Sequence, residues 1–342
     1  MSVLASLPGL SGIFVVSALA VWFAGSQLSS STDALSKRYH FGEALGGTVL
    51  LAVATNLPEI AITSTAAISG HLDLAVGNIL GGVGIQTVVL VALDFAQASP
   101  LTSRTTSLRP LLPACLVVAV LAVTVMGTAV PRSIVVAHVS PEDVAIAVVW
   151  GAGLLLIRRA GRGVPWKLAA PPARPRRQAA ATNRSLVDRR PILVFCAAAA
   201  VTLVAGAALA QTGEAISHQI GLQGVVFGAT VLAAVTALPE LSTGLAAVRI
   251  GDHELAVSDI FGGNAFLPVI LLLVTFISGQ PALPSAGKSD VYLAVLGILV
   301  TMPYIAGLIF RPRREYARLG PDSIAVLVIY VLGMVGLVVV DH

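Results

Sequence analysis

The sequence predicts an all-α membrane protein with ten transmembrane helices, arranged as two inverted repeats of five helices. Three observations lead to this fold class. Only 11% of the 342 residues are charged and 56% are hydrophobic, whereas a soluble globular chain has about 25% charged residues. A long segment occurs twice along the chain, and almost all Lys and Arg residues fall on one side of the predicted membrane.

Ten apolar stretches are long enough to cross a bilayer as helices, which takes about 20 residues. They lie at residues 9–28, 42–69, 72–96, 108–128, 142–158, 191–211, 221–249, 253–278, 288–310 and 320–340. The first stretch has no small-residue cleavage site and is expected to be a mature span. A segment rich in Arg and Pro separates the fifth and sixth stretches and is too polar to span. This division predicts a first repeat at 1–158, a linker at 159–190 and a second repeat at 191–342.

The basic residues predict the orientation of the spans. If the linker is cytoplasmic and the ten spans alternate, 19 of the 21 Lys and Arg residues lie on the cytoplasmic side, and only Arg132 and Lys288 lie outside. Such an asymmetry is typical of multi-pass membrane proteins. We therefore expect a protein of a bacterial-type cell membrane with both termini outside the cytoplasm. Five spans per repeat is an odd number, so the second repeat enters the membrane in the opposite direction.

The duplicated segment is Gly47–Gln86, which aligns without a gap on Gly228–Leu267. Fifteen of the aligned positions are identical. They include the Leu-Pro-Glu sequences that end at Glu59 and Glu240. The separation of these two glutamates along the sequence is the constant offset between equivalent residues of the two repeats. A repeat of this length indicates a duplicated half-protein, and in such proteins the substrate site is expected near the axis that relates the halves.

Glu59 and Glu240 are the candidate ion ligands because each lies well inside an apolar span. A carboxylate at the bilayer centre costs about 2.5–3.5 kcal/mol on insertion scales, so intramembrane acids usually mark a functional site. The structural alternative is a pair of protonated carboxyl groups that bond within the bundle. That need rarely recurs at the same position of two repeats.

The residues around each glutamate are also oxygen donors. Pro58 and Pro239 cannot donate a backbone hydrogen bond, which leaves a carbonyl free in the preceding turn. Thr55 and Thr236 add hydroxyl groups. Calcium takes about 6–8 oxygen ligands in flexible geometry, and two carboxylates would neutralise one divalent cation.

The pattern (A/V)-T-x-L-P-E followed by a Gly turn and L-A-V-(G/S)-(N/D)-I-x-G-G, present twice, resembles the alpha-repeats of the cation/calcium exchanger superfamily, the sodium/calcium exchangers above all. The match is close over the duplicated segment of each half. The resemblance implies an alternating-access antiporter that holds its ions at the level of Thr55, Glu59, Thr236 and Glu240.

The sequence departs from the family pattern where the family carries further side-chain oxygens. The family's third-span pattern is G-N-x-x-G-S-N-x-x-(N/D). Here both serines of the pattern are glycine, its last position is Gln86 in one repeat and Leu267 in the other, and Asn56 replaces a serine after the first threonine. A set of several sodium sites is therefore in question, and coupling to protons becomes an alternative. The remaining candidate ligands from the third spans are Asn78 and Asp259.

The expected function is secondary active antiport of calcium or a similar divalent cation against sodium or protons. A passive channel and an intramembrane enzyme are the rivals, but the spans carry no His-Glu-x-x-His and no paired Gly-x-Gly-Asp aspartate. We expect no enzyme activity and no cofactor. The expected partners are membrane lipids and the transported cations, with no nucleic acid, and the sequence sets no oligomeric state.

Overall fold

The computed structural model describes residues 6–39, 53–97, 100–105, 107–131, 139–161, 190–312 and 314–341, and within these ranges the chain is helical without named strands. The predicted linker therefore lies almost wholly outside the described residues, as does the first part of the predicted span 42–69. The first half contains α1 (Leu7–Tyr39), α3 (Leu57–Ile68), α4 (Leu72–Phe95), the short α5 (Leu101–Arg104), α6 (Leu111–Gly127) and α7 (Pro141–Gly161).

The second half begins with α8 (Arg190–Ile220). It continues with α9 (Gly224–Phe227), the π-helical turn η2 (Gly228–Leu232), α10 (Ala233–Thr236), α11 (Leu238–Arg249), α12 (His253–Phe266), the 3-10 turn η3 (Leu267–Val269), α13 (Ile270–Ser278), the 3-10 turn η4 (Leu283–Ser285), α14 (Lys288–Phe310) and α15 (Pro321–Asp341). Seven helical segments of the described part are long and apolar enough to cross a membrane.

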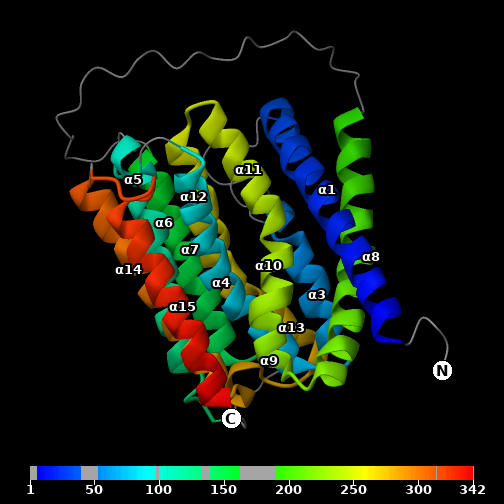
Figure 1. Cartoon of the computed structure of the whole chain (residues 1–342). Helices are drawn as coiled ribbons and strands as arrows, with labels where there is room; N and C mark the ends of the chain where they lie inside the picture. Colours follow the sequence, from blue (N-terminus) through cyan, green and yellow to red (C-terminus); the bar gives the residue numbers. More distant parts are fainter. Residues whose placement is uncertain are drawn as a thin grey trace.

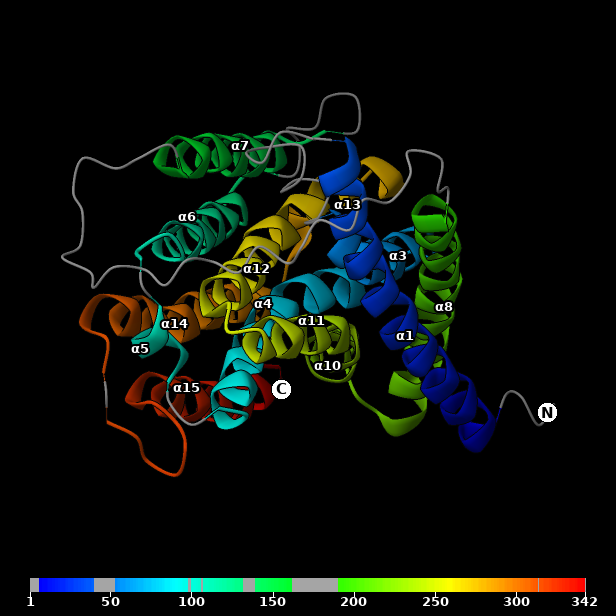
Figure 2. The ribbon, with the colours of Figure 1, turned by 90° about the horizontal axis from the view of Figure 1, so that it is seen from above.

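Helix α4 is the centre of the bundle. In its most apolar 18-residue window 89% of the residues are buried, against 22% for the matching window of α1. Helices α3, α9, α10, α11, α12, α14 and α15 all contact α4. The polar residues Asn78, Gln86, Thr87 and Asp94 of α4 are all fully buried, and polar side chains of membrane helices face the interior of a bundle. Helices α1 and α8 pack against each other at the edge of the molecule, with α3 beside α8 (Figures 1 and 2).

The two Leu-Pro-Glu segments fold alike. Helices α3 and α11 both have 12 residues and begin at a leucine just after a break in the chain. Gly70 and Gly251 lie just beyond the ends of these helices, and both have a φ of +81°. The next amide returns to the helix in both copies, from His71 N to Ala66 O and from Asp252 N to Ala247 O, each at 2.9 Å. The sequence repeat is thus a structural repeat in this region, with the glycine at the left-handed position that ends a helix.

The contacts between the halves repeat as well. A Cβ atom added to Gly25 of α1 would lie 2.6 Å from Pro239 Cγ, and one added to Gly206 of α8 would lie 2.5 Å from Ala61 Cβ. Gly25 and Gly206 are related by the same offset as the two motifs. Each edge helix therefore approaches the broken helix of the other half at a glycine. On the axis between the halves, Asn264 Nδ2 donates to Val83 O at 3.3 Å, and these two positions, 181 residues apart, are also related by the offset.

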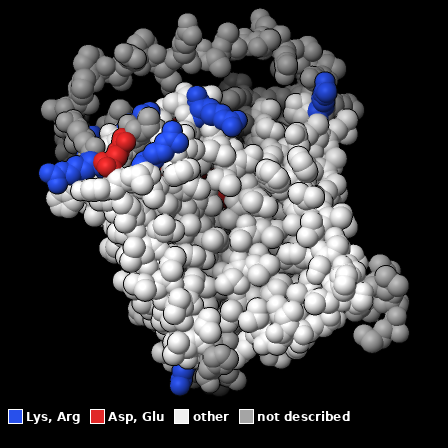
Figure 3. All heavy atoms as spheres, viewed as in Figure 1, with Lys and Arg blue, Asp and Glu red and all other residues white. Residues whose placement is uncertain are grey.

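The direction of the helices agrees with inverted halves. Figure 1 shows that α1 and α8, the first helices of the two halves, run in opposite directions. The described N- and C-terminal residues lie at the same end of the bundle. Figure 3 shows Lys and Arg gathered mainly at the opposite end. Arg104 and Arg249 are the last residues of α5 and α11, Arg190 is the first residue of α8, and Arg311 directly follows α14.

Helices α1 and α8 are longer than the apolar stretches 9–28 and 191–211 predicted. The polar residues that follow those stretches do not end the helices because their hydroxyl groups donate back to carbonyls of the preceding turn. Thr32 Oγ1 donates to Leu28 O at 2.8 Å, and Thr212 Oγ1 donates to Ala208 O at 2.6 Å. Pro268 accounts for another difference, the 3-10 turn that interrupts the predicted span 253–278.

Replacement of Gly81 by alanine is expected to destabilise the protein by about 1–3 kcal/mol, because its Cβ would collide with the backbone of Ala229. Gly262 is the equivalent residue of the other half, and a Cβ there meets nothing within 4 Å. Thermal unfolding in detergent should therefore show a lower Tm for Gly81→Ala and no loss for Gly262→Ala. Equal Tm values for the two variants would contradict the close packing of α4 on η2.

Candidate ion-binding site

The two glutamates lie in the first turns of α3 and α11, directly after the chain breaks. The Glu59 side chain is fully buried, and Glu240 is 5% exposed. The break places a helix N-terminus inside the bundle, and its partial positive charge favours a nearby anion. This partial charge offsets only part of the cost of burying a carboxylate, so both side chains depend on their polar neighbours.

Glu59 is held by groups from both halves. Gln86 Nε2 on α4 donates to Glu59 Oε1 at 3.1 Å, and the Thr236 side chain of α10 lies close to the same carboxylate. The Thr236 hydroxyl itself donates to Ala233 O at 3.2 Å, which leaves its oxygen lone pairs available to a ligand. Glu59 Oε2 has no hydrogen-bond partner among the described residues.

Asn56 and Thr55 extend this polar cluster. Asn56 is fully buried, and its Nδ2 lies 3.4 Å from Thr55 Oγ1. A Cβ added to Gly263 would lie 3.4 Å from Asn56 Nδ2 and 3.7 Å from Gln86 Oε1. Gly263, where the family pattern has serine, therefore lies beside two amide side chains. A serine side chain at this position would point toward these two amides.

Glu240 has a different environment from Glu59. Neither of its carboxylate oxygens has a hydrogen-bond partner in the described part of the chain. The acids Glu59 and Asp259 are close enough to act on it electrostatically. The position equivalent to Gln86 is Leu267, whose Cδ1 would lie 3.1 Å from a Cβ on Gly82. One glutamate thus has an amide donor, while its counterpart has a leucine at the equivalent position and two like charges nearby.

The remaining candidates from the third spans are placed less uniformly. Asp259 is half-buried near Glu240. Asn78 is fully buried beside the backbone of Gly228, and neither amide atom has a partner among the described residues. The described contacts bring Thr55, Asn56, Glu59, Gln86, Thr236, Glu240 and Asp259 into one region. They do not join Asn78 to either glutamate.

The roles of Asn264 of α12, Thr87 of α4 and Asp94 near the end of α4 become visible only in the structure. Asn264 Nδ2 donates to Thr87 Oγ1 at 3.0 Å, next to its contact with Val83. The 181-residue offset pairs Asn264 with Val83 and could have indicated that they meet at the axis. Asp94 is buried but serves the fold, because it accepts bonds from Leu101 N at 2.7 Å and from Ser323 Oγ at 2.6 Å.

The cluster offers carboxylate, amide and hydroxyl oxygens at the middle of the bundle. These are the ligand types that calcium and other hard cations prefer. In the described residues, no group of three or more His, Cys, Asp and Glu side chains is arranged to hold a metal ion. Carboxylate, carbonyl and hydroxyl oxygens suit hard cations, whereas zinc and copper favour imidazole and thiolate ligands.

Comparisons with known proteins identify the family of the chain. The model of the sodium/calcium exchanger protein family matches residues 10–157 and 190–339. Inner membrane protein YrbG of Escherichia coli (strain K12) is 28% identical over 283 residues, covering 81% of each chain.

Two solved structures share the fold. The crystal structure of the H+/Ca2+ exchanger CAX superposes with a TM-score of 0.69 at 11% identity, covering 97% of this chain and 87% of the other. The sodium-calcium exchanger NCX_Mj superposes with a TM-score of 0.59 at 15% identity, covering 98% and 99%. The duplicated motifs, the multi-pass helical fold and the family match over both halves lead to one conclusion: the chain is a membrane protein of the sodium/calcium exchanger family.

Proposed function

We propose that the protein is a secondary active antiporter that exchanges calcium, or a similar divalent cation, for sodium or protons by alternating access. The observation that carries this proposal is the pair of buried glutamates, one of which has no hydrogen-bond partner for either oxygen among the described residues. Two such carboxylates close together are unstable as bare anions. A divalent cation neutralises both, and protons or sodium ions do the same in its absence.

In this proposal Glu59 and Glu240 bind the divalent cation directly. Thr55, Thr236, Asn56 and Gln86 supply further oxygens from the surrounding cluster, and Asp259 and Asn78 line the path of the ions. The chain then forms ten transmembrane helices as two inverted repeats, at residues 1–158 and 191–342, joined by a cytoplasmic linker at 159–190. Both termini lie outside the cytoplasm, no cofactor takes part, and the partners are membrane lipids and the transported ions.

Divalent-ion flux into proteoliposomes tests the exchange and the roles of the glutamates. Glu59→Gln and Glu240→Gln should each reduce calcium uptake at least tenfold, because each removes one of the two charges that balance the ion. Asp73→Asn is the matched control, since Asp73 is an exposed acid in the first turn of α4. Uptake that persists in both glutamine variants would contradict the site.

The same vesicles identify the coupling ion. Uptake is compared under an imposed sodium gradient and under an imposed proton gradient. Because both serines of the family pattern are glycine here, we expect the proton gradient to drive the larger flux. Uptake that needs no counter-ion at all would indicate a channel and contradict antiport.

Gln86→Leu gives the first repeat the residue that the second already has, since Leu267 occupies the equivalent position. Loss of the 3.1 Å bond to Glu59 should raise the KM for calcium about tenfold, because a hydrogen bond to a charged group contributes about 1.5–3 kcal/mol. Leu267→Met is the control, because it changes the equivalent position without adding a charge or a donor. An equal KM in both variants would show that Gln86 does not position Glu59.

A further inference from the structure

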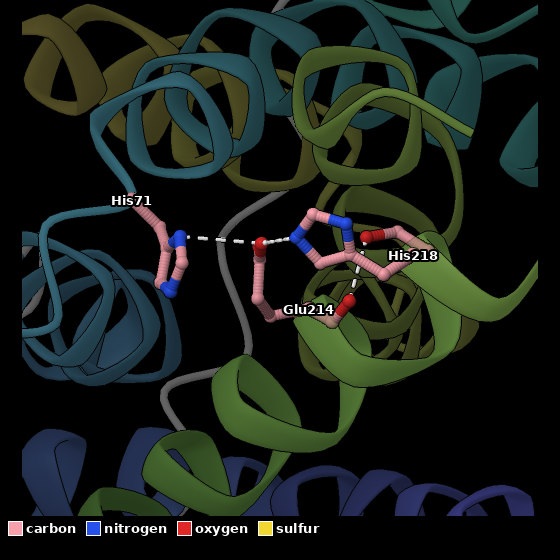
Figure 4. Close-up of polar contacts among 4 residues, drawn as sticks. His71, Glu214 and His218 are labelled. Carbon is pink, nitrogen blue, oxygen red and sulfur yellow. Dashed lines mark hydrogen bonds and ion pairs between the residues drawn. The ribbon is translucent and has the colours of Figure 1, made fainter. Parts of the chain in front are cut away.

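A cluster of titratable side chains lies away from the candidate ion site, at the end of the bundle that carries the chain termini. His71 Nδ1, in the turn between α3 and α4, lies 3.2 Å from Glu214 Oε1 of α8. His218 Nε2, one turn further along α8, lies 2.7 Å from the same oxygen. Figure 4 shows the two imidazole rings on either side of this carboxylate oxygen. The cluster joins an edge helix to the central part of the bundle.

We propose that His71, Glu214 and His218 form a pH-sensitive latch that holds the outer end of α8 against the α3–α4 turn and tightens as the outer solution becomes acidic. The inference rests on the proposed alternating access and orientation. In that scheme α8 must move relative to the centre of the bundle. The latch stabilises the arrangement seen in this structure and slows the departure from it.

The burial of the three side chains explains why protonation matters. The Glu214 side chain is only 14% exposed, and its Oε2 atom has no hydrogen-bond partner among the described residues. The side chains of His71 and His218 are 40% and 75% exposed, so both imidazoles exchange protons with water. A carboxylate withdrawn from water in this way depends on its donors for stabilisation. Neutral imidazoles supply ordinary hydrogen bonds, whereas protonated ones supply charge-assisted bonds that are about twice as strong.

Histidine is the side chain whose charge ordinarily changes between about pH 5 and 8. An imidazole that gains a proton adds a positive charge beside Glu214. His218 also lies in the last turn of α8. A positive charge in that position is favoured by the helix dipole. Acidification therefore strengthens the contacts on both sides of Glu214.

The surroundings add little competing charge. On α4, Asp73 is exposed, and its carboxylate lies against Gly224 at the start of α9. The residues of α9 are uncharged, as are α1 from Leu7 to Thr32 and the end of α13. Helix α3 carries Glu59 in its first turn, at the end away from the latch. Among the described residues, Asp73 is thus the one further charged group near the latch on the elements packed around it, and its negative charge also favours protonated imidazoles.

The turn that holds His71 is well fixed. Gly70 takes a φ of +81°, and His71 N donates to Ala66 O at 2.9 Å. Helix α8 ends beyond the latch at Gly221, where Leu222 N donates to Ser217 O at 2.9 Å. The α3–α4 turn and the end of α8, which carry the latch residues, are therefore both fixed by backbone hydrogen bonds. A change in the strength of the contact is transmitted to whole helices instead of being lost in loop motion.

The other half of the chain shows why this sensitivity is confined to one side of the membrane. At the offset of the repeat, Glu214 and His218 correspond to Asp33 and Lys37, so an acid and a base with the same spacing recur on α1. The position equivalent to His71 is Asp252. A lysine ammonium keeps its charge throughout the physiological pH range. The acid–base spacing is thus common to both edge helices, but histidine occurs only in the outer set.

Hydrogen exchange of the full-length protein in lipid nanodiscs tests the latch without requiring transport. After correction for intrinsic exchange rates, backbone amides of residues 213–221 should be about fivefold better protected at pH 5.5 than at pH 8, as expected for partly exposed ion pairs. The double variant His71→Asn/His218→Gln and the variant Glu214→Gln should lose this difference. Asparagine is a good residue at the start of α4, so the turn should be retained. His253→Gln, at the opposite end of the bundle, should keep the difference.

Equal protection at the two pH values in the wild type, or a difference that survives in the latch variants, would overturn the proposal. Flux provides the second measurement, with the internal pH fixed and the external pH set to 5.5 or 8. The double variant should transport several-fold faster than the wild type at pH 5.5 and equally fast at pH 8. Dividing the flux of the double variant by that of the wild type at each pH cancels the effect of direct competition by protons at the ion site. A ratio that is independent of pH would also overturn the latch.

The two measurements fail separately from the proposed function. If neither protein transports calcium under any gradient, antiport is refuted and the hydrogen-exchange result alone decides the latch. If transport is present but protection is independent of pH, antiport stands and the latch is refuted.

Discussion

The burial of two carboxylates at the middle of an apolar bundle is the constraint on which the rest of the structure depends. Glu59 and Glu240 lie within reach of each other's charge, with little exposure to solvent. Each needs a helix N-terminus at membrane depth, and a proline after a break supplies it. Helix α4 lies at the centre of the bundle and brings Gln86 to Glu59.

The two halves share backbone features but differ in the polar side chains around the two glutamates. Backbone features recur at the 181-residue offset, including the left-handed glycines and the glycine contacts of α1 and α8. The polar groups do not recur, since Gln86 faces Glu59 while Leu267 occupies its equivalent position. In the proposed exchange, the inverted repeat supplies two similar ways into the site, and the chemical asymmetry within the site lets the two carboxylates respond differently to the same cation.

Much of this arrangement could be predicted from the sequence because the offset is constant. The breaks before Glu59 and Glu240, the glycine turns and most of the helical segments follow from local patterns of apolar residues, proline and glycine. The bond from Gln86 to Glu59 could not be predicted, because it depends on how α4 crosses α3. The lengths of α1 and α8 were underestimated, since hydropathy does not register a threonine that bonds to its own helix, as Thr212 does.

The underestimated part of α8 is also where the fold carries its second polar cluster. An apolar helix that ended near residue 211 would place nothing opposite His71, whereas the continued helix presents Glu214 and His218 to that turn. The extension lies beyond the most apolar part of the span, and its His218 side chain is 75% exposed, whereas Glu214 is 14% exposed. Residues that contribute nothing to membrane insertion thus remain free to set how firmly an edge helix is held, and the symmetric position on α1 carries a lysine whose charge does not change in the same pH range. Regulation by pH in this fold requires only a change of base at the end of one edge helix, while the ion site at the centre stays the same.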